Sequence, residues 1–240
     1  MPLDKWPGGG IIWAMDSPFS INFAEIIDYI HPVAQKIHDE LLLSKDQKLA
    51  VFGGFVRDAV LANAFDKPRP KFKDVDVVMN KKPAELDGNP NIQSHYFNYF
   101  GGAIMKLNGI SVEIFSRDAE DFKEFIGITP LNCNRLIYIF KENKLYILPE
   151  FYKFVRTKTI SIVAPGFQRN PGGHHLNAFL TSHKLSQRFE MNIGVSNDIK
   201  SWFQNAPEEF IKKSLQIMYK KMRMGELSKN ILTEFQNIRK

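Results

Sequence analysis

A pair of glycines ends an apolar run near residue 50, and this feature constrains the local fold more than any other. The run Leu49–Phe52 is short and β-prone, it stops at Gly53-Gly54, and Val56–Ala64 reads as a helix. Glycine permits a sharp change of backbone direction and exposes backbone N–H groups at the start of a following helix. The sequence therefore predicts strand, glycine turn and helix in that order. The glycines have two interpretations, a phosphate cradle and an ordinary tight turn.

A strand with two acidic residues follows the polar, proline-containing loop that comes after this helix. In Asp74–Met79 the residues alternate, so that the apolar side chains share one face while Asp74 and Asp76 share the other. Carboxylates at positions i and i+2 of a strand point the same way from Cα atoms roughly 6 to 7 Å apart. This spacing suits them to hold divalent cations from one side. An isolated Asp-x-Asp is more often a solvated strand face, so the metal site depends on the surrounding sequence.

A β-hairpin supplies a third acidic residue. Ala103–Leu107 and Ile110–Ser116 are β-prone runs joined by Asn108-Gly109, a dipeptide that favours a two-residue hairpin turn. Glu113 falls in the middle of the second run. Sites that transfer phosphoryl groups with two metal ions usually contain a third carboxylate, and Glu113 is the candidate.

The remaining pattern divides the chain into three parts. Helical spacing of apolar residues extends from Ser20 to Leu43, with Ser20 as the expected cap and Pro32 as the expected kink. A third β pair is expected around Glu142-Asn143, and the breaker-rich stretch 164–173 precedes a mainly helical region. We therefore expect a helical lead-in over 1–45, a central domain over 46–165 and a helical C-terminal domain over 166–240.

The amino-acid composition limits the cellular compartment and the binding partners that we expect for this protein. The 240 residues are 44% hydrophobic, enough for a real core, and the single cysteine, Cys133, excludes a disulfide framework and reads as a small buried residue. The apolar stretch Ile11–Met15 is too short for a signal core or a membrane span. We expect a cytoplasmic protein without a membrane partner. The net charge of +6 favours a polyanionic partner such as RNA.

Two basic segments are candidates for RNA contact. One is an expected amphipathic helix near the C-terminus, whose basic face is either a solvated surface or an RNA-binding surface. The other is the loop before Asp74. The basic residues of the two segments are Lys212, Lys213, Lys220, Lys221 and Arg223 in the helix, and Lys67, Arg69, Lys71 and Lys73 in the loop.

Taken in order, these motifs resemble a known family. Gly53–Asp58 (Gly-Gly-Phe-Val-Arg-Asp), Asp74–Val77 (Asp-Val-Asp-Val) and Val112–Arg117 (Val-Glu-Ile-Phe-Ser-Arg) are similar to the head domain of bacterial-type poly(A) polymerases and CCA-adding enzymes. Leu131–Tyr138 is similar to a further motif of that family and places Asn134 on its asparagine. The resemblance implies a DNA polymerase β-like nucleotidyltransferase fold. This is an α+β architecture with a mixed β-sheet flanked by helices, followed here by a small, mainly helical domain.

The resemblance also implies roles for individual residues. The carboxylates would bind Mg²⁺ or Mn²⁺ and carry the catalysis, while the glycines and polar residues of the other motifs would serve the nucleotide. The carboxylates are Asp74, Asp76 and Glu113, and the nucleotide-binding residues are Gly53, Gly54, Arg57, Asp58, Arg117 and Asn134. The implied partners are a nucleoside triphosphate and an RNA acceptor.

The chain also departs from the family pattern. The family selects the incoming base with Glu-Asp-x-x-Arg, whereas Glu208-Glu209 is followed by Phe210-Ile211-Lys212 and does not fit. The sequence therefore leaves three functions open: nucleotide addition to an RNA 3′ end, nucleotide transfer to a protein or small molecule, and non-catalytic RNA binding on the same fold.

Overall fold

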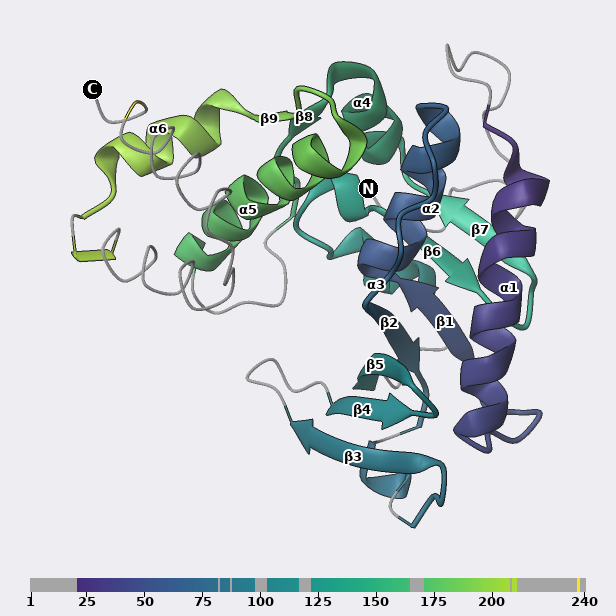
Figure 1. The fold of residues 1–240 in the computed structure, drawn as a ribbon. Helices are drawn as coiled ribbons and strands as arrows, with labels where there is room; N and C mark the ends of the chain where they lie inside the picture. The colour runs from purple at the N-terminus through teal and green to yellow at the C-terminus, as the bar shows by residue number, and fades with distance from the viewer. Residues whose placement is uncertain are drawn as a thin grey trace.

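A seven-stranded mixed sheet forms the centre of the molecule in this computed structural model, with helices on both sides (Figure 1). The structure describes residues 21–81, 83–86, 88–97, 103–116, 122–164, 171–207, 209–210 and 237. The strand order is β3-β4-β5-β2-β1-β6-β7. The strands are β1 (Leu49–Phe52), β2 (Asp74–Met79), β3 (Ile92–Phe97), β4 (Ala103–Leu107), β5 (Ile110–Ser116), β6 (Leu136–Ile139) and β7 (Lys144–Ile147). The α+β class with a mixed sheet and flanking helices is confirmed.

Two of the helices around the sheet were not predicted from the sequence pattern. The helices are α1 (Phe23–Glu40), α2 (Gly53–Ala64), α3 (Phe122–Gly127), α4 (Pro149–Thr157), α5 (Pro171–Phe189) and α6 (Asn197–Asn205), with 3-10 turns η2 (Pro83–Leu86) and η3 (Asn132–Asn134). In Figure 1, α1 and α5 lie on opposite sides of α2. Helices α3 and α4 were not predicted because each is at most three turns long, too short for a clear periodic pattern.

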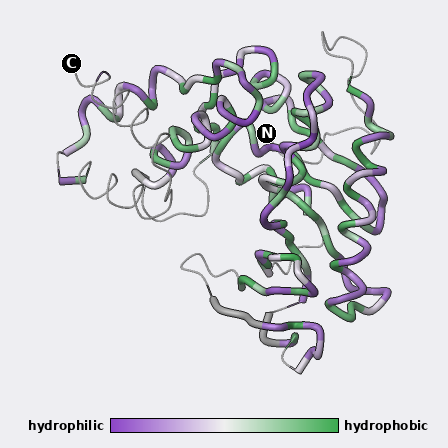
Figure 2. The backbone as a smooth tube through the Cα atoms, viewed as in Figure 1, coloured by the Kyte–Doolittle hydropathy of each residue, from purple (hydrophilic) through white to green (hydrophobic). Residues whose placement is uncertain are grey.

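Helix α1 corrects one detail of the sequence prediction. The residue that caps it is Asn22, whose side chain accepts a hydrogen bond from the Glu25 backbone N–H, and not Ser20. The helix is one continuous element that includes Pro32. Its buried stripe packs into the main core, and Figure 2 shows hydrophilic and hydrophobic stretches alternating along it. The stripe consists of Ile26, Ile30, Ala34 and Ile37.

The two hairpin predictions are confirmed. Asn108 and Gly109 both have positive φ angles, 39° and 87°, as the two central residues of a type I′ turn require. Strands β4 and β5 pair antiparallel on either side of this turn. Strands β6 and β7 pair in the same way, and Asn143 between them also has a positive φ.

The sheet buries residues on both of its faces. Val75, Val77 and Met79 of β2 enter the larger core, which α1 and α2 complete. On the opposite face, Val78 packs in a smaller cluster with Phe122 and Phe125 of α3. The alternation along β2 therefore places Asp74 and Asp76 on the face that α3 partly covers.

The C-terminal elements continue from the central core. A two-stranded parallel sheet pairs β8 (Thr159–Ile160) with β9 (Gly194–Val195), and apolar residues of α5 and α6 belong to the larger cluster. The Pro-Gly-Gly segment from Pro171, at the end of the breaker-rich stretch, opens α5, where proline is well suited to a helix start. The three domain ranges remain predictions. Among the described residues, no helix has the length and apolar character needed to cross a membrane.

Candidate nucleotidyl-transfer site

Strands β2 and β5 bring two of the predicted carboxylates together. The strands pair in parallel, with Asp76 in register with Glu113 and Asp74 in register with Ser111. Residues in register on neighbouring strands point to the same face of a sheet. Asp76 and Glu113 therefore lie side by side, and Asp74 joins their face at the exposed start of β2.

The environment of Asp76 disfavours its negative charge. Desolvation is the largest cause that raises its pKa, and repulsion by Glu113 and then by Asp74 adds to it. The hydrogen bond from the Gly54 N–H and the charge of Arg57 act in the opposite direction but are weaker. Together these effects raise the pKa of Asp76 from 3.8 to about 7. The fold thus holds a carboxylate where additional positive charge would stabilise it.

Aromatic rings explain part of this desolvation. Phe52 is the partner of Asp76 across the β1–β2 ladder, and its ring packs on that of Phe125 with centroids 4.7 Å apart. Phe115, two residues after Glu113, contacts the Phe52 ring at 5.6 Å. The same sheet face is therefore apolar under α3 and acidic at its neighbouring end.

Gly53 is required by this arrangement for two reasons. Its φ angle of 69° lies in the left-handed region, which favours glycine. A Cβ atom at this position would lie 1.9 Å from Asp76 Oδ2 and 3.0 Å from Asp76 Cβ. The absence of a side chain at Gly53 thus makes room for the Asp76 carboxylate. Neither interpretation from the sequence included this steric role.

Gly54 contributes a backbone donor, and its N–H points at the carboxylate. The Gly54 N–H donates to Asp76 Oδ2 over 3.3 Å at the start of α2. A Cβ at Gly54 would meet only Arg57 Nη2 at 3.6 Å, an ordinary contact. The first turn of α2 is thus tied to β2 beside the carboxylates. Triphosphate binding by the two glycines remains a prediction.

A partly buried polar network links three of the other predicted nucleotide residues. Arg57 donates from Nε to Asp58 Oδ1 over 2.8 Å and from Nη1 to Asn134 Oδ1 over 3.0 Å. Arg188 of α5 donates to the second oxygen of Asp58. Cys133, next to Asn134, is fully buried as expected, and burial raises the pKa of its thiol to about 11. Arg57, Asp58 and Asn134 are thus one connected group that joins α2, η3 and α5.

The donor set matches a hard divalent cation in its chemistry. Mg²⁺ and Mn²⁺ prefer carboxylate oxygens, and burial, with repulsion by Glu113 and Asp74 adding to it, raises the pKa of Asp76. Within the described ranges, however, no three acidic, histidine or cysteine side chains are already arranged as a set of metal ligands. Metal binding by Asp74, Asp76 and Glu113 therefore remains a prediction.

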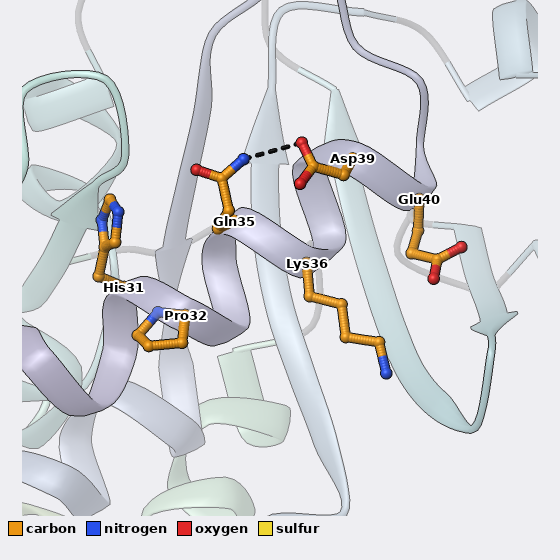
Figure 3. Close-up of a pocket in the computed structure, with 6 residues that line it drawn as sticks. All are labelled: His31, Pro32, Gln35, Lys36, Asp39 and Glu40. Atoms are coloured by element: carbon orange, nitrogen blue, oxygen red, sulfur yellow. Dashed lines mark hydrogen bonds between the residues drawn. The ribbon is translucent and has the colours of Figure 1, made fainter.

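Some predicted residues are not described by the structure, and one surface hollow lies away from the site. Arg117 and the basic C-terminal positions Lys212, Lys213, Lys220, Lys221 and Arg223 are not among the described residues. A separate hollow lies along the outer surface of α1, lined by residues from His31 to Glu40 (Figure 3). Gln35 donates to Asp39, one turn further along the same helix, over 2.8 Å. None of its lining residues belongs to β2, β5 or the first turn of α2.

Known structures share this architecture. An apo tRNA-processing enzyme aligns with a TM-score of 0.58 at 18% identity, covering 92% of this chain and 58% of its own. A tRNA nucleotidyltransferase complexed with a primer tRNA and an incoming ATP analog aligns at 0.55 and 20%, covering 86% and 60%. A CCA-adding enzyme in complex with CTP aligns at 0.57 and 17%, covering 92% and 56%. The chain therefore shares the fold of these enzymes over the part that it spans.

The similarity covers only part of each known structure. The chain spans less than two thirds of the length of each of these three enzymes. No protein-family model matches the sequence, and a search of curated proteins finds no match. The nucleotidyltransferase fold is therefore shared at low identity, and the reaction has to be argued from the site.

Sequence reasoning missed two residues of the site. Arg188 pairs with Asp58 across 130 positions of the chain, and no local motif marks it. Phe52 was assigned only to a strand, although its ring lies opposite Asp76. Its position directly before the glycine pair was the one available indication that it lies near the site.

Proposed function

We propose that this protein is a metal-dependent nucleotidyltransferase that adds nucleotides from a nucleoside triphosphate to the 3′ end of an RNA. The observation that carries the proposal is the in-register pair Asp76 and Glu113 beside the glycine turn. Support comes from the fold, because structures that share it contain a primer tRNA, an ATP analog or CTP.

In this proposal the three carboxylates Asp74, Asp76 and Glu113 hold Mg²⁺ or Mn²⁺. When bound, such ions lower the pKa of the attacking hydroxyl and neutralise the leaving pyrophosphate. Gly53 leaves space for Asp76, and the Gly54 N–H orients its Oδ2 atom. The chain's own contribution is thus to fix the carboxylates on one sheet face next to a helix start.

The buried network serves the nucleotide pocket. Arg57 holds Asn134 and Asp58, and Arg188 holds Asp58 from the other side, so the first turns of α2 keep one orientation. We assign Gly53, Gly54 and Arg117 to the phosphates. The lead-in, head and C-terminal domains are assigned to 1–45, 46–165 and 166–240, and the protein is assigned to the cytoplasm.

Labelled nucleotides separate this reaction from its alternatives. The protein is incubated with each labelled nucleoside triphosphate, Mg²⁺ and a mixed RNA pool, and the products are separated by size. Labelled RNA is the expected result. Label on the protein itself would indicate transfer to a protein acceptor, and no labelled product with any triphosphate would indicate a non-catalytic module. Either of these results would overturn the proposal.

Thermal unfolding tests nucleotide binding without chemistry. A ligand that binds only the folded state at about a hundred times its dissociation constant adds roughly 2.7 kcal/mol to the free energy of unfolding. We expect this shift with a triphosphate and Mg²⁺ together. Absence of a shift with every triphosphate and metal would contradict the site assignment.

A further inference from the structure

The loop between α2 and β2 consists of two parts with different partners. Its first two basic residues, Lys67 and Arg69, form ion pairs with other residues of this chain. Lys67 Nζ lies 3.6 Å from Glu190 Oε2. Arg69 pairs with the Glu25 carboxylate and lies over the Tyr29 ring at 4.7 Å. These contacts attach the first half of the loop to α1 and to the end of α5.

The second half of the loop faces solvent. Lys71, Phe72 and Lys73 are all exposed, and they directly precede Asp74. Phe72 is 37% exposed and is the only exposed aromatic ring among the described side chains. No ion pair of Lys71 or Lys73 with another described residue is found, in contrast to Lys67 and Arg69. The segment thus presents a ring between two positive charges at the edge of the candidate site.

Phe72 is exposed but held in position. Its ring packs edge-on against Phe55 with centroids 4.7 Å apart, and Phe55 is 4% exposed in the first turns of α2. Phe55 in turn contacts Tyr29 at 5.5 Å, and Arg69 covers Tyr29. A chain of ring contacts therefore fixes Phe72 between the glycine turn and the start of β2. A ring fixed in this way loses little conformational freedom when it binds a partner.

We propose that Lys71-Phe72-Lys73 binds a single-stranded polynucleotide, namely the 3′ segment of the RNA acceptor, next to the carboxylates. This rests on the proposed function, since it names the surface that receives the acceptor. An exposed ring stacks on any nucleobase, and lysines on either side neutralise adjacent phosphates. The occupant is a polyanion with planar groups because the segment offers positive charge and a π face together. An acidic protein would use the charges but not the ring.

Fluorescence anisotropy of a short, 5′-labelled single-stranded RNA tests the proposal in EDTA, where nucleotide transfer does not occur. In Phe72→Leu the apolar contact with Phe55 is kept and the π face is lost. Stacking contributes about 1 to 3 kcal/mol per base, so we expect affinity to fall roughly tenfold in this variant. In Lys71→Ala/Lys73→Ala the slope of log affinity against log salt should fall by about 0.7 per lysine.

Two controls match these variants. Lys144→Ala removes an exposed lysine from β7, an edge strand three places from β2, and Leu42→Ala removes an exposed apolar side chain after α1. Both should bind RNA as the unsubstituted protein does. The melting temperature of each variant shows whether a loss of affinity reflects unfolding.

The outcomes separate this proposal from the proposed function. RNA binding that depends on Phe72, without transfer under any condition, would uphold the RNA surface and overturn the enzyme. Transfer to RNA with full affinity in Phe72→Leu would uphold the enzyme and overturn the RNA surface. Equal binding of polyglutamate and RNA, independent of Phe72, would also overturn it, because charge alone would explain the contact. Binding of a DNA strand of the same sequence with the same dependence on Phe72 would support stacking.

Discussion

Asp58 is buried and Asp76 is partly buried, and the fold treats their charges differently. Asp58 is 5% exposed, and each of its oxygens accepts a hydrogen bond from an arginine, Arg57 on one side and Arg188 on the other. Asp76 receives one backbone N–H and faces two further carboxylates. The fold therefore compensates one carboxylate fully and leaves the other short of positive charge.

This difference indicates that Asp58 and Asp76 have different roles. A buried carboxylate with two cationic partners fixes the position of a helix, and removal of one partner lowers the stability of the fold. A buried charge next to like charges lowers the stability of the apo protein and persists where function requires it. We therefore expect changes at Asp58 to affect stability first and changes at Asp76 to affect activity first.

The largest effect is expected for Asp76→Asn. Loss of this charge removes a proposed metal ligand, so transfer of label to RNA should fall by at least about a thousandfold. The apo protein should unfold at the same temperature or higher, because repulsion with Glu113 is lost. Asp74→Asn should also abolish transfer, and Glu113→Gln should impair it. Full activity of Asp76→Asn would contradict the metal assignment.

The two glycines give a paired test of the geometry around Asp76. Gly53→Ala combines a left-handed backbone with a clash against the carboxylate, so the free energy of unfolding should fall by about 3 to 4 kcal/mol. Gly54→Ala, with only an ordinary contact to Arg57, should be neutral or raise it by about 0.5 to 1 kcal/mol. Denaturant unfolding measures both. Equal effects of the two substitutions would show that Asp76 does not occupy the space beside Gly53.

The pH dependence of stability distinguishes Asp76 from an ordinary surface carboxylate. Its folded pKa of about 7 lies above its ordinary value of 3.8, so the folded state binds more protons than the unfolded state between these values. Stability contributed by this group is therefore present below about pH 4 and is lost as the pH rises to about 7. In EDTA, Asp76→Asn should gain on the order of 4 kcal/mol relative to the unsubstituted protein over this range. A constant difference across the range would contradict a raised pKa.

The smallest effect is expected at Asp58, the carboxylate with two arginine partners. In Arg188→Ala the Asp58 carboxylate keeps Arg57 but loses its second partner, so the free energy of unfolding should fall by about 1 to 2 kcal/mol. Arg188→Lys should restore part of this loss. An unchanged melting temperature for Arg188→Ala would remove the proposed difference between the two carboxylates.

Local elements were predictable from the sequence, whereas their long-range pairing was not. The alternation in Asp74–Met79 and the Asn108-Gly109 turn each determine a conformation from neighbouring residues, and the structure confirms both. The parallel pairing of β2 with β5 joins segments separated by two other strands, and no local pattern specifies it. The sequence therefore identified Asp76 and Glu113 as separate candidates, and only the fold makes them neighbours.

Strand β3 shows the other limit of sequence reading. Its sequence, Ile-Gln-Ser-His-Tyr-Phe over Ile92–Phe97, does not alternate regularly, and it lies at the edge of the sheet. An edge strand has one neighbour and needs a weaker pattern. Arg188 was missed for a related reason, because an ion pair between two helices leaves no periodic trace in either of them.

The parallel pairing of β2 with β5 also has a consequence for how the chain folds. The β4–β5 hairpin closes a two-residue turn and can form within microseconds, whereas β2 has to meet β5 after a long loop closes. That meeting brings carboxylates together, so repulsion opposes the step in the absence of cations. We expect refolding to accelerate when millimolar Mg²⁺ is present. In a cell, the ion would then assist assembly of the sheet before any substrate arrives.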